Sequence, residues 1–96
     1  MGITRVRKRD GRLVDFIQEK ITDAIRKSLI AARMEDLSIA SSISDSVVAT
    51  LNEKYKDKIP SVEDIQDIVI EKLGKFGYGI VAEEYRSFRV KKAEIR

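Results

Sequence analysis

Residues 3–16 read ITRVRKRDGRLVDF, and this stretch decides the N-terminal part of the fold. The Asp10-Gly11 pair, flanked by residues 3–9 and 12–16, is the strongest short hairpin signal in the chain. Both central residues of a type I′ turn need positive φ, and Asp-Gly adopts that conformation at low cost. The stretch therefore predicts a β-hairpin that turns at Asp10-Gly11.

After Phe16 the apolar residues recur every three or four positions, which is the period of an amphipathic helix. Four such stripes follow one another and predict four helices. The stripes are Ile17, Ile21, Ile25, Leu29 and Ala32; Ile39, Ile43, Val47, Leu51 and Tyr55; Val62, Ile65, Val69, Leu73 and Phe76; and Tyr78, Val81, Ala82, Tyr85 and Phe88.

Polar and glycine residues punctuate these stripes. Ser38 is a predicted N-cap of the second helix, and residues 61–64 (SVED) resemble a capping box before the third. Glycines at positions 74, 77 and 79 predict where the third helix stops. A two-stranded hairpin is marginal alone, so it must pack on the helices. The sequence thus predicts an α+β fold, with residues 1–96 forming a single domain.

Composition excludes several kinds of chemistry. The 96 residues are 43% hydrophobic and 36% charged, with no Cys and no His. Disulfides, thiolate zinc sites and imidazole-dependent catalysis are therefore excluded. No apolar run approaches the roughly 20 residues of a membrane span, and no signal-peptide core opens the chain. The lack of cysteine suits a reducing compartment, and we expect a cytoplasmic protein.

The hairpin carries an unusual concentration of positive charge. For Arg5, Arg7 and Arg12 a solvated edge that discourages strand pairing is the simplest interpretation. Strand alternation, however, places Lys8 on the same face as Val6, toward the helices. A lysine that points inward needs an anionic partner, either a phosphate or a carboxylate of the first helix.

Lys20 lies one turn into the first helix, whose free amides and dipole favour anions. It could join Lys8 around one phosphate group. The alternative is a solvated lysine paired with Glu19 or Asp23, which composition alone favours. No set of residues indicates catalytic turnover, and the carboxylates at 64, 67 and 71 are more typical of a solvated helix face than of a metal site.

Residues 6–11 (VRKRDG), followed by Phe16 and then Lys20-Ile21, resemble the opening of the ATP-cone domain. Residues 60–67 (PSVEDIQD) are similar to the "t-v-x-x-I-q" stretch of that family, and residues 85–88 (YRSF) resemble its closing segment. The resemblance runs from about residue 6 to residue 92. The order of these short motifs along the chain makes the resemblance specific.

The resemblance implies a three-stranded sheet on a four-helix bundle, with a short third strand near residues 59–62. It implies a non-catalytic allosteric module that binds ATP or dATP, with or without Mg2+, and regulates an attached or partner ribonucleotide reductase. Residue by residue, it implies phosphate contacts from Lys8, Arg9, Lys20 and Lys91, and base contacts from Ile21, Val62 and Gln66.

Two departures from the family pattern matter. Many members carry Asp or Asn where this chain has Ile17, so a polar contact there is lost or moves to Asp15. The zinc ribbon of the family's repressor members is also missing, and the lack of Cys disfavours that identity.

A small basic nucleic-acid-binding domain or transcription regulator is the alternative. The net charge of only +3 argues against it, because a broad phosphate footprint needs more positive charge. Binding to DNA would also weaken steeply with salt, with a log–log slope of about −0.9 per neutralised phosphate. For the regulatory module we expect a homodimer with dATP, or a monomer that stiffens when nucleotide binds.

Overall fold

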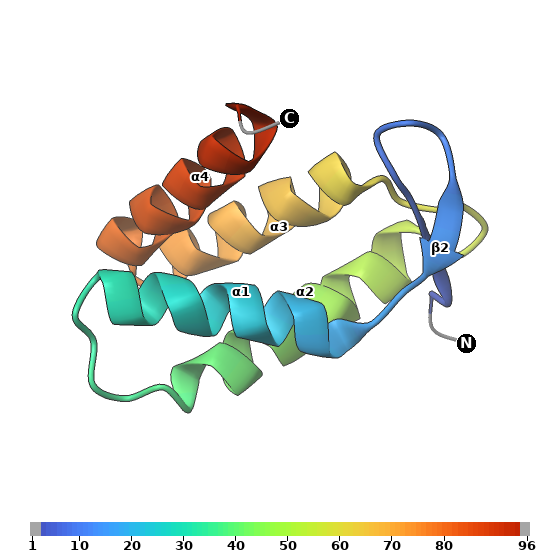
Figure 1. Cartoon of the computed structure of the whole chain (residues 1–96). Helices are drawn as coiled ribbons and strands as arrows, with labels where there is room; N and C mark the ends of the chain where they lie inside the picture. Colours follow the sequence, from blue (N-terminus) through green and yellow to red (C-terminus); the bar gives the residue numbers. More distant parts are fainter. Residues whose placement is uncertain (1–2, 95–96) are drawn as a thin grey trace.

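The computed structural model describes the backbone of residues 3–94 and the side chains of residues 3–87. A short hairpin leads into four helices (Figure 1). The elements are β1 (Arg5–Arg7), β2 (Leu13–Asp15), α1 (Gln18–Ala31), α2 (Ile39–Lys54), α3 (Val62–Lys75) and α4 (Gly79–Glu94). The predicted α+β class with four helices is confirmed.

The helices form a closed arrangement in which each packs against two others. α1 contacts α2 and α4, and α3 contacts the same two helices. Figure 1 shows the hairpin at one end of this bundle, beside the first turns of α1 and α3. Only residues 16 and 17 connect β2 to α1, so the hairpin and the first helix are closely coupled.

The core fills the space between the four predicted apolar stripes. Leu29, Val47, Leu51, Val69 and Leu73 are fully inaccessible to solvent. Val6 of β1 belongs to the same cluster and is 8% exposed, so the hairpin contributes one buried side chain to the core.

Two residues of the predicted stripes lie outside this core. Ile17 is 46% exposed and Phe76 is 54% exposed. Ile17 is the cap residue before α1, and Phe76 is the cap residue after α3. Because both lie outside the helices, the helical spacing does not direct their side chains into the core. The Phe88 side chain lies outside the described residues.

The hairpin turn differs from the predicted type I′ turn. β1 and β2 pair antiparallel with Val6 opposite Val14, which leaves a three-residue loop between Lys8 and Arg12. Gly11 N donates to Lys8 O at 2.9 Å, and Lys8 N donates to Arg12 O at 2.8 Å. Gly11 has φ 92°, whereas Asp10 does not have a positive φ. These bonds are typical of a three-residue loop with glycine in the left-handed position.

The prediction of a third strand near residues 59–62 is wrong, because the described part of the chain contains two strands. A single parallel bridge between Arg7 and Ser61 stands in its place, with Arg7 N donating to Pro60 O at 2.9 Å. Pro60 has no N–H to give to a ladder. Ser61 N is also occupied, since it donates to Asp64 Oδ2 at 3.1 Å. The chain therefore enters a helix after one bridge.

The two predicted N-caps have different outcomes. Asp64 N donates to Ser61 Oγ at 3.0 Å, which completes the capping box expected for α3. Ser38 precedes α2 but makes no capping bond. Its hydroxyl instead donates to Asp36 Oδ1 at 2.5 Å, because its helical φ and ψ turn it away from the free amides.

The ends of α1 and α3 share one geometry. After α3, Tyr78 N donates to Leu73 O and Gly77 N to Gly74 O, and Gly77 has φ 86°. After α1, Met34 N donates to Leu29 O, and the left-handed position is taken by Arg33 with φ 62°. Both are Schellman ends, and glycine is the residue that this position favours. Gly77 confirms the predicted stop of the third helix.

We expect Arg33→Gly to raise the free energy of unfolding by about 0.5–1 kcal/mol. The left-handed conformation costs a non-glycine residue roughly 1–2 kcal/mol, and the extra freedom of glycine in the unfolded chain offsets part of that gain. Gly77→Ala is the reciprocal control and should destabilise by about 1 kcal/mol, since a Cβ at Gly77 would meet no atom within 4 Å and only the backbone strain changes. Urea denaturation measures both, and a destabilised Arg33→Gly variant would contradict this account.

Candidate functional site

An open pocket of about 500 Å³ lies between the hairpin loop and the first turn of α3. Its volume is within the range of small-molecule sites. It is lined by Lys8, Arg9, Asp10, Arg12, Val62, Glu63 and Gln66. The cations come from the hairpin loop, and the apolar and amide groups come from α3. The Arg7–Pro60 hydrogen bond holds these two segments side by side.

Four of the seven predicted site residues meet in this pocket: Lys8, Arg9, Val62 and Gln66. Lys8 reaches it in a different way from the one predicted. β1 ends at Arg7, so strand alternation no longer governs Lys8, whose side chain is exposed at the pocket rather than packed under the hairpin.

Two of the remaining predicted residues, Ile21 and Lys20, do not line the pocket. Ile21 is 7% exposed and belongs to the core, and Lys20 is exposed on the first turn of α1. Among the described residues Lys20 forms no ion pair with Glu19 or Asp23, and Asp23 pairs with Arg26 at 2.6 Å instead. The Lys91 side chain lies outside the described residues, although its backbone belongs to α4.

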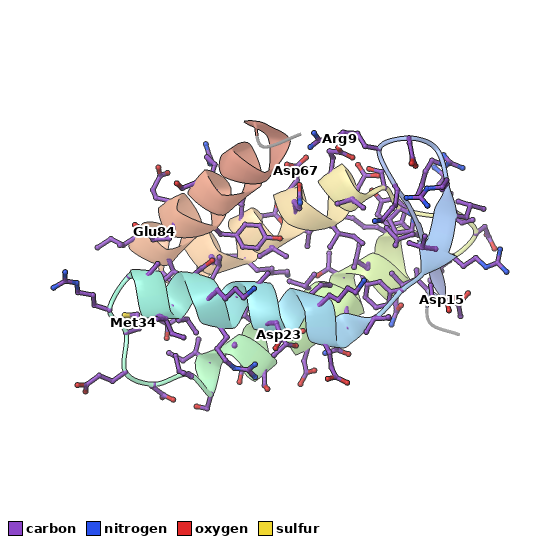
Figure 2. All side chains as sticks on the ribbon, viewed as in Figure 1. Arg9, Asp15, Asp23, Met34, Asp67 and Glu84 are labelled. Atoms are coloured by element: carbon purple, nitrogen blue, oxygen red, sulfur yellow. The ribbon has the colours of Figure 1, made fainter. Side chains whose placement is uncertain are left out.

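The contact expected to move to Asp15 does not reach this pocket either. Figure 2 shows Asp15 pointing away from the hairpin tip at the lower part of β2. The start of α1 makes other polar contacts. Gln18 Nε2 donates to Asp45 Oδ1 at 2.7 Å, and Thr22 Oγ1 donates to the buried Ser44 Oγ at 2.8 Å. These bonds fix the first turns of α1 against α2.

Two of the pocket's cations are paired with carboxylates. Arg9 Nε donates to Glu63 Oε2 at 2.7 Å, and Arg12 Nε donates to Asp10 Oδ2 at 2.8 Å. In Figure 2 the Arg9 side chain extends from the hairpin tip on the side of α3. Lys8 makes no ion pair within the described part of the chain, so it is the cation most readily available to an incoming anion.

Asp10 keeps its negative charge beside these cations. Its Oδ1 accepts from Arg12 N at 3.1 Å. This backbone hydrogen bond, helped by the Arg12 guanidinium, holds the pKa of Asp10 below its ordinary value. Near the start of α3, burial and the Asp64 carboxylate raise the pKa of Tyr55. The phenol of Tyr55 therefore stays neutral.

Gln66 carries an unused acceptor at the pocket. Its Oε1 is buried and accepts no hydrogen bond from the described residues. A buried polar atom without a partner is uncommon and needs a physical explanation. Because solvent does not reach this atom, a ligand in the pocket would satisfy it only after the Gln66 side chain rotates.

Arg12, Asp10 and Glu63 line the pocket but were not predicted as site residues. Arg12 was interpreted as a solvated edge charge, and local sequence pattern does not separate the two roles. The Arg9–Glu63 pair joins residues 54 positions apart, so only the packing of the hairpin on α3 brings them together. The position of Glu63 in the first turn of a capped helix was the one available signal.

None of the helices in the described part of the chain is long and apolar enough to cross a membrane. The same part of the chain holds no group of three or more His, Cys, Asp or Glu side chains arranged to bind a metal ion.

The family model of the ATP cone domain matches residues 4–94, nearly the whole chain. The chain belongs to the ATP-cone domain family. This is a regulatory, non-catalytic domain, and the predicted allosteric nucleotide-binding module is confirmed at that level. The alternative of a nucleic-acid-binding domain is not favoured.

Among curated proteins this ATP-cone chain is similar to vitamin B12-dependent ribonucleoside-diphosphate reductases. It is 37% identical to the enzyme of Thermoplasma acidophilum over 98% of the chain, and 33% identical to that of Mycobacterium tuberculosis strain CDC 1551 over 100% of the chain. The chain spans only 12% and 14% of the length of these two relatives.

Proposed function

We propose that this ATP-cone domain, formed by residues 1–96, binds ATP or dATP and thereby regulates a ribonucleotide reductase. The observation that carries the proposal is the pocket between the hairpin loop and α3, where cations of the loop are brought together with an amide side chain, Gln66, of α3. A triphosphate needs the first feature, and a nucleoside with hydrogen-bond donors needs the second.

In this proposal the hairpin loop holds the phosphates through Lys8 and Arg9. Lys20 and Lys91 add charge from the neighbouring helices α1 and α4. Val62, which is half-buried, lies on the apolar side of the nucleoside, against the core cluster to which Ile21 belongs, and Gln66 hydrogen-bonds the nucleoside. Mg2+ would accompany the triphosphate, as it usually does through phosphate oxygens and water.

Few contacts tie the hairpin to the helices, which makes it a suitable element to respond. Val6 packs in the core, Arg7 N bonds Pro60 O, and Ile3 N donates to Asn52 Oδ1 at 2.9 Å. The exposed Arg9–Glu63 ion pair adds one further link. A nucleotide that bridges the loop and the helix starts adds further links at this position. A signal results only if ATP and dATP differ in their affinity for two arrangements of the domain.

The reductase partner is proposed from the relatives, whose names describe vitamin B12-dependent ribonucleoside-diphosphate reductases. The regulated part is then a catalytic domain or subunit of such an enzyme. Its activity would change through contacts that the nucleotide-bound domain makes or releases.

We expect Lys8→Ala and Lys20→Ala each to weaken ATP binding by about 1–3 kcal/mol, the scale of a hydrogen bond to a charged group. Isothermal titration calorimetry measures the change. Lys27→Ala is the matched control, because Lys27 is exposed on the same helix but lies seven residues beyond Lys20, about two turns further from the hairpin. Unchanged affinity in both test variants would show that the triphosphate does not bind at this site.

Gln66 tests the nucleoside side of the pocket. We expect Gln66→Leu to weaken ATP binding by about 0.5–1.5 kcal/mol, because the ligand loses one acceptor. A loss with ATP alone would identify the ribose 2′-hydroxyl as the donor, whereas an equal loss with dATP would assign the donor to the adenine amino group or the 3′-hydroxyl. We also expect ATP to bind more tightly than GTP, which presents an acceptor in place of that amino group. Equal affinities for ATP and GTP would contradict adenine selectivity.

Nucleotide should also change assembly or rigidity. Lys8, Arg9 and Lys20 repel one another until phosphate neutralises them, so binding should stiffen the hairpin. We expect a homodimer with dATP, measured by light scattering, or slower amide exchange over residues 3–16 in a domain that remains monomeric. If saturating nucleotide changes neither mass nor exchange, the domain binds nucleotide without transmitting a signal.

A further inference from the structure

The Arg9–Glu63 ion pair joins the tip of the hairpin to the first turn of α3. The Arg9 Nε and Glu63 Oε2 atoms are 2.7 Å apart, and the two side chains are 53% and 33% exposed. Both residues line the pocket described above. A carboxylate of the protein is therefore paired with one of the cations to which a phosphate group would bind.

The local structure holds Glu63 in this position. Ser61 and Asp64 form the capping box that starts α3, which places Glu63 at the second helical residue. A carboxylate in the first turn is favoured by the free amides and the dipole of the helix. The Glu63 carboxylate thus has support of its own at the rim of the pocket, and it is not carried there by Arg9 alone.

An anionic ligand meets two effects of this carboxylate. It has to replace Glu63 as the partner of Arg9, and it has to tolerate the remaining negative charge at the pocket rim. The cost of displacing Glu63 from Arg9 is the same for every ligand, whereas repulsion by the remaining carboxylate grows with the charge of the ligand. The carboxylate therefore weakens binding of every phosphate ligand, and it reduces the gain in affinity that each additional phosphate brings.

We propose that Glu63 is an internal competitor for the phosphate-binding Arg9, and that it sets how strongly affinity at this site depends on the number of phosphates. The proposal rests on the proposed function, because it assumes that nucleotide phosphates bind in this pocket. In the empty domain Arg9 holds the hairpin tip on α3 through Glu63. In the bound domain Arg9 contacts phosphate, and the direct link between the tip and α3 is broken.

Glu63→Gln tests the competition. It keeps the size and helical preference of the side chain and removes the charge. We expect ATP to bind about three- to tenfold more tightly, which corresponds to an exposed ion pair together with the removal of one repulsive charge. Glu71→Gln is the matched control, because Glu71 is an exposed residue of the same helix that does not line the pocket. It changes net charge equally and should leave the affinity within about twofold.

Two further titrations make the test specific. In the Arg9→Ala background, Glu63→Gln should lose most of its gain, because the competition requires both partners. Titrations in EDTA and in Mg2+ should both show the gain. Weaker ATP binding by Glu63→Gln in Mg2+ would overturn the proposal, since the carboxylate would then hold the metal of the ligand. An unchanged affinity, or an equal gain in Glu71→Gln, would overturn it as well.

Amide exchange of the empty domain gives a readout that needs no ligand. We expect Glu63→Gln to speed exchange in the loop at residues 9–11 and to leave α2 unchanged. ATP should remove this difference between the variant and the parent. Wild-type protein that binds neither ATP nor inorganic triphosphate would refute the proposed function. Wild-type protein that binds ATP, with Glu63→Gln unchanged in affinity and loop exchange, would refute only the competition.

Discussion

The hydrogen bond from Arg7 N to Pro60 O is the contact on which the pocket depends. It joins the last residue of β1 to the segment that starts α3, two parts of the chain that are far apart in sequence. The loop beyond β1 carries the cations, and the helix beyond Pro60 carries Glu63 and Gln66. The contact remains a single bridge because proline cannot donate and Ser61 N caps the helix. A longer ladder would replace the helix turn that lines the pocket.

Local features of the fold could be predicted from the sequence, and those set by packing could not. The hairpin, the helices and the capping box depend on neighbouring residues, so their patterns were sufficient. The turn type was not predictable, because the pairing of Val6 with Val14 leaves three loop residues where Asp-Gly suggested two. The third strand expected from the family does not form, because the backbone N–H of Ser61 is bonded in the capping box of α3 and is not available to the sheet.

The site was predictable to a similar degree. Motifs of the family located Lys8, Arg9, Val62 and Gln66, which the structure brings together. Ile21 followed from the same resemblance, but in this chain its side chain is part of the core. Glu63 carries no recognisable motif, and its meaning depends on Arg9, 54 residues away. Opposite charges in the same pocket are a property of the folded surface, which explains why composition and spacing revealed the cations and not the carboxylate that opposes them.

Because only two residues connect β2 to α1, a tilt of the hairpin is transmitted directly to the first helix. Fourteen residues at 1.5 Å per residue give α1 a length of about 21 Å. A tilt of about 5° at the hairpin end of a rod of that length displaces its other end by about 2 Å. That other end carries Ile30, which is 58% exposed, and the left-handed turn at Arg33. Because hydrogen bonds join the first turns of α1 to α2, a rotation of the hairpin that α1 follows must carry α2 with it. Its displacement is largest at the opposite end of the bundle, on a surface that does not line the pocket.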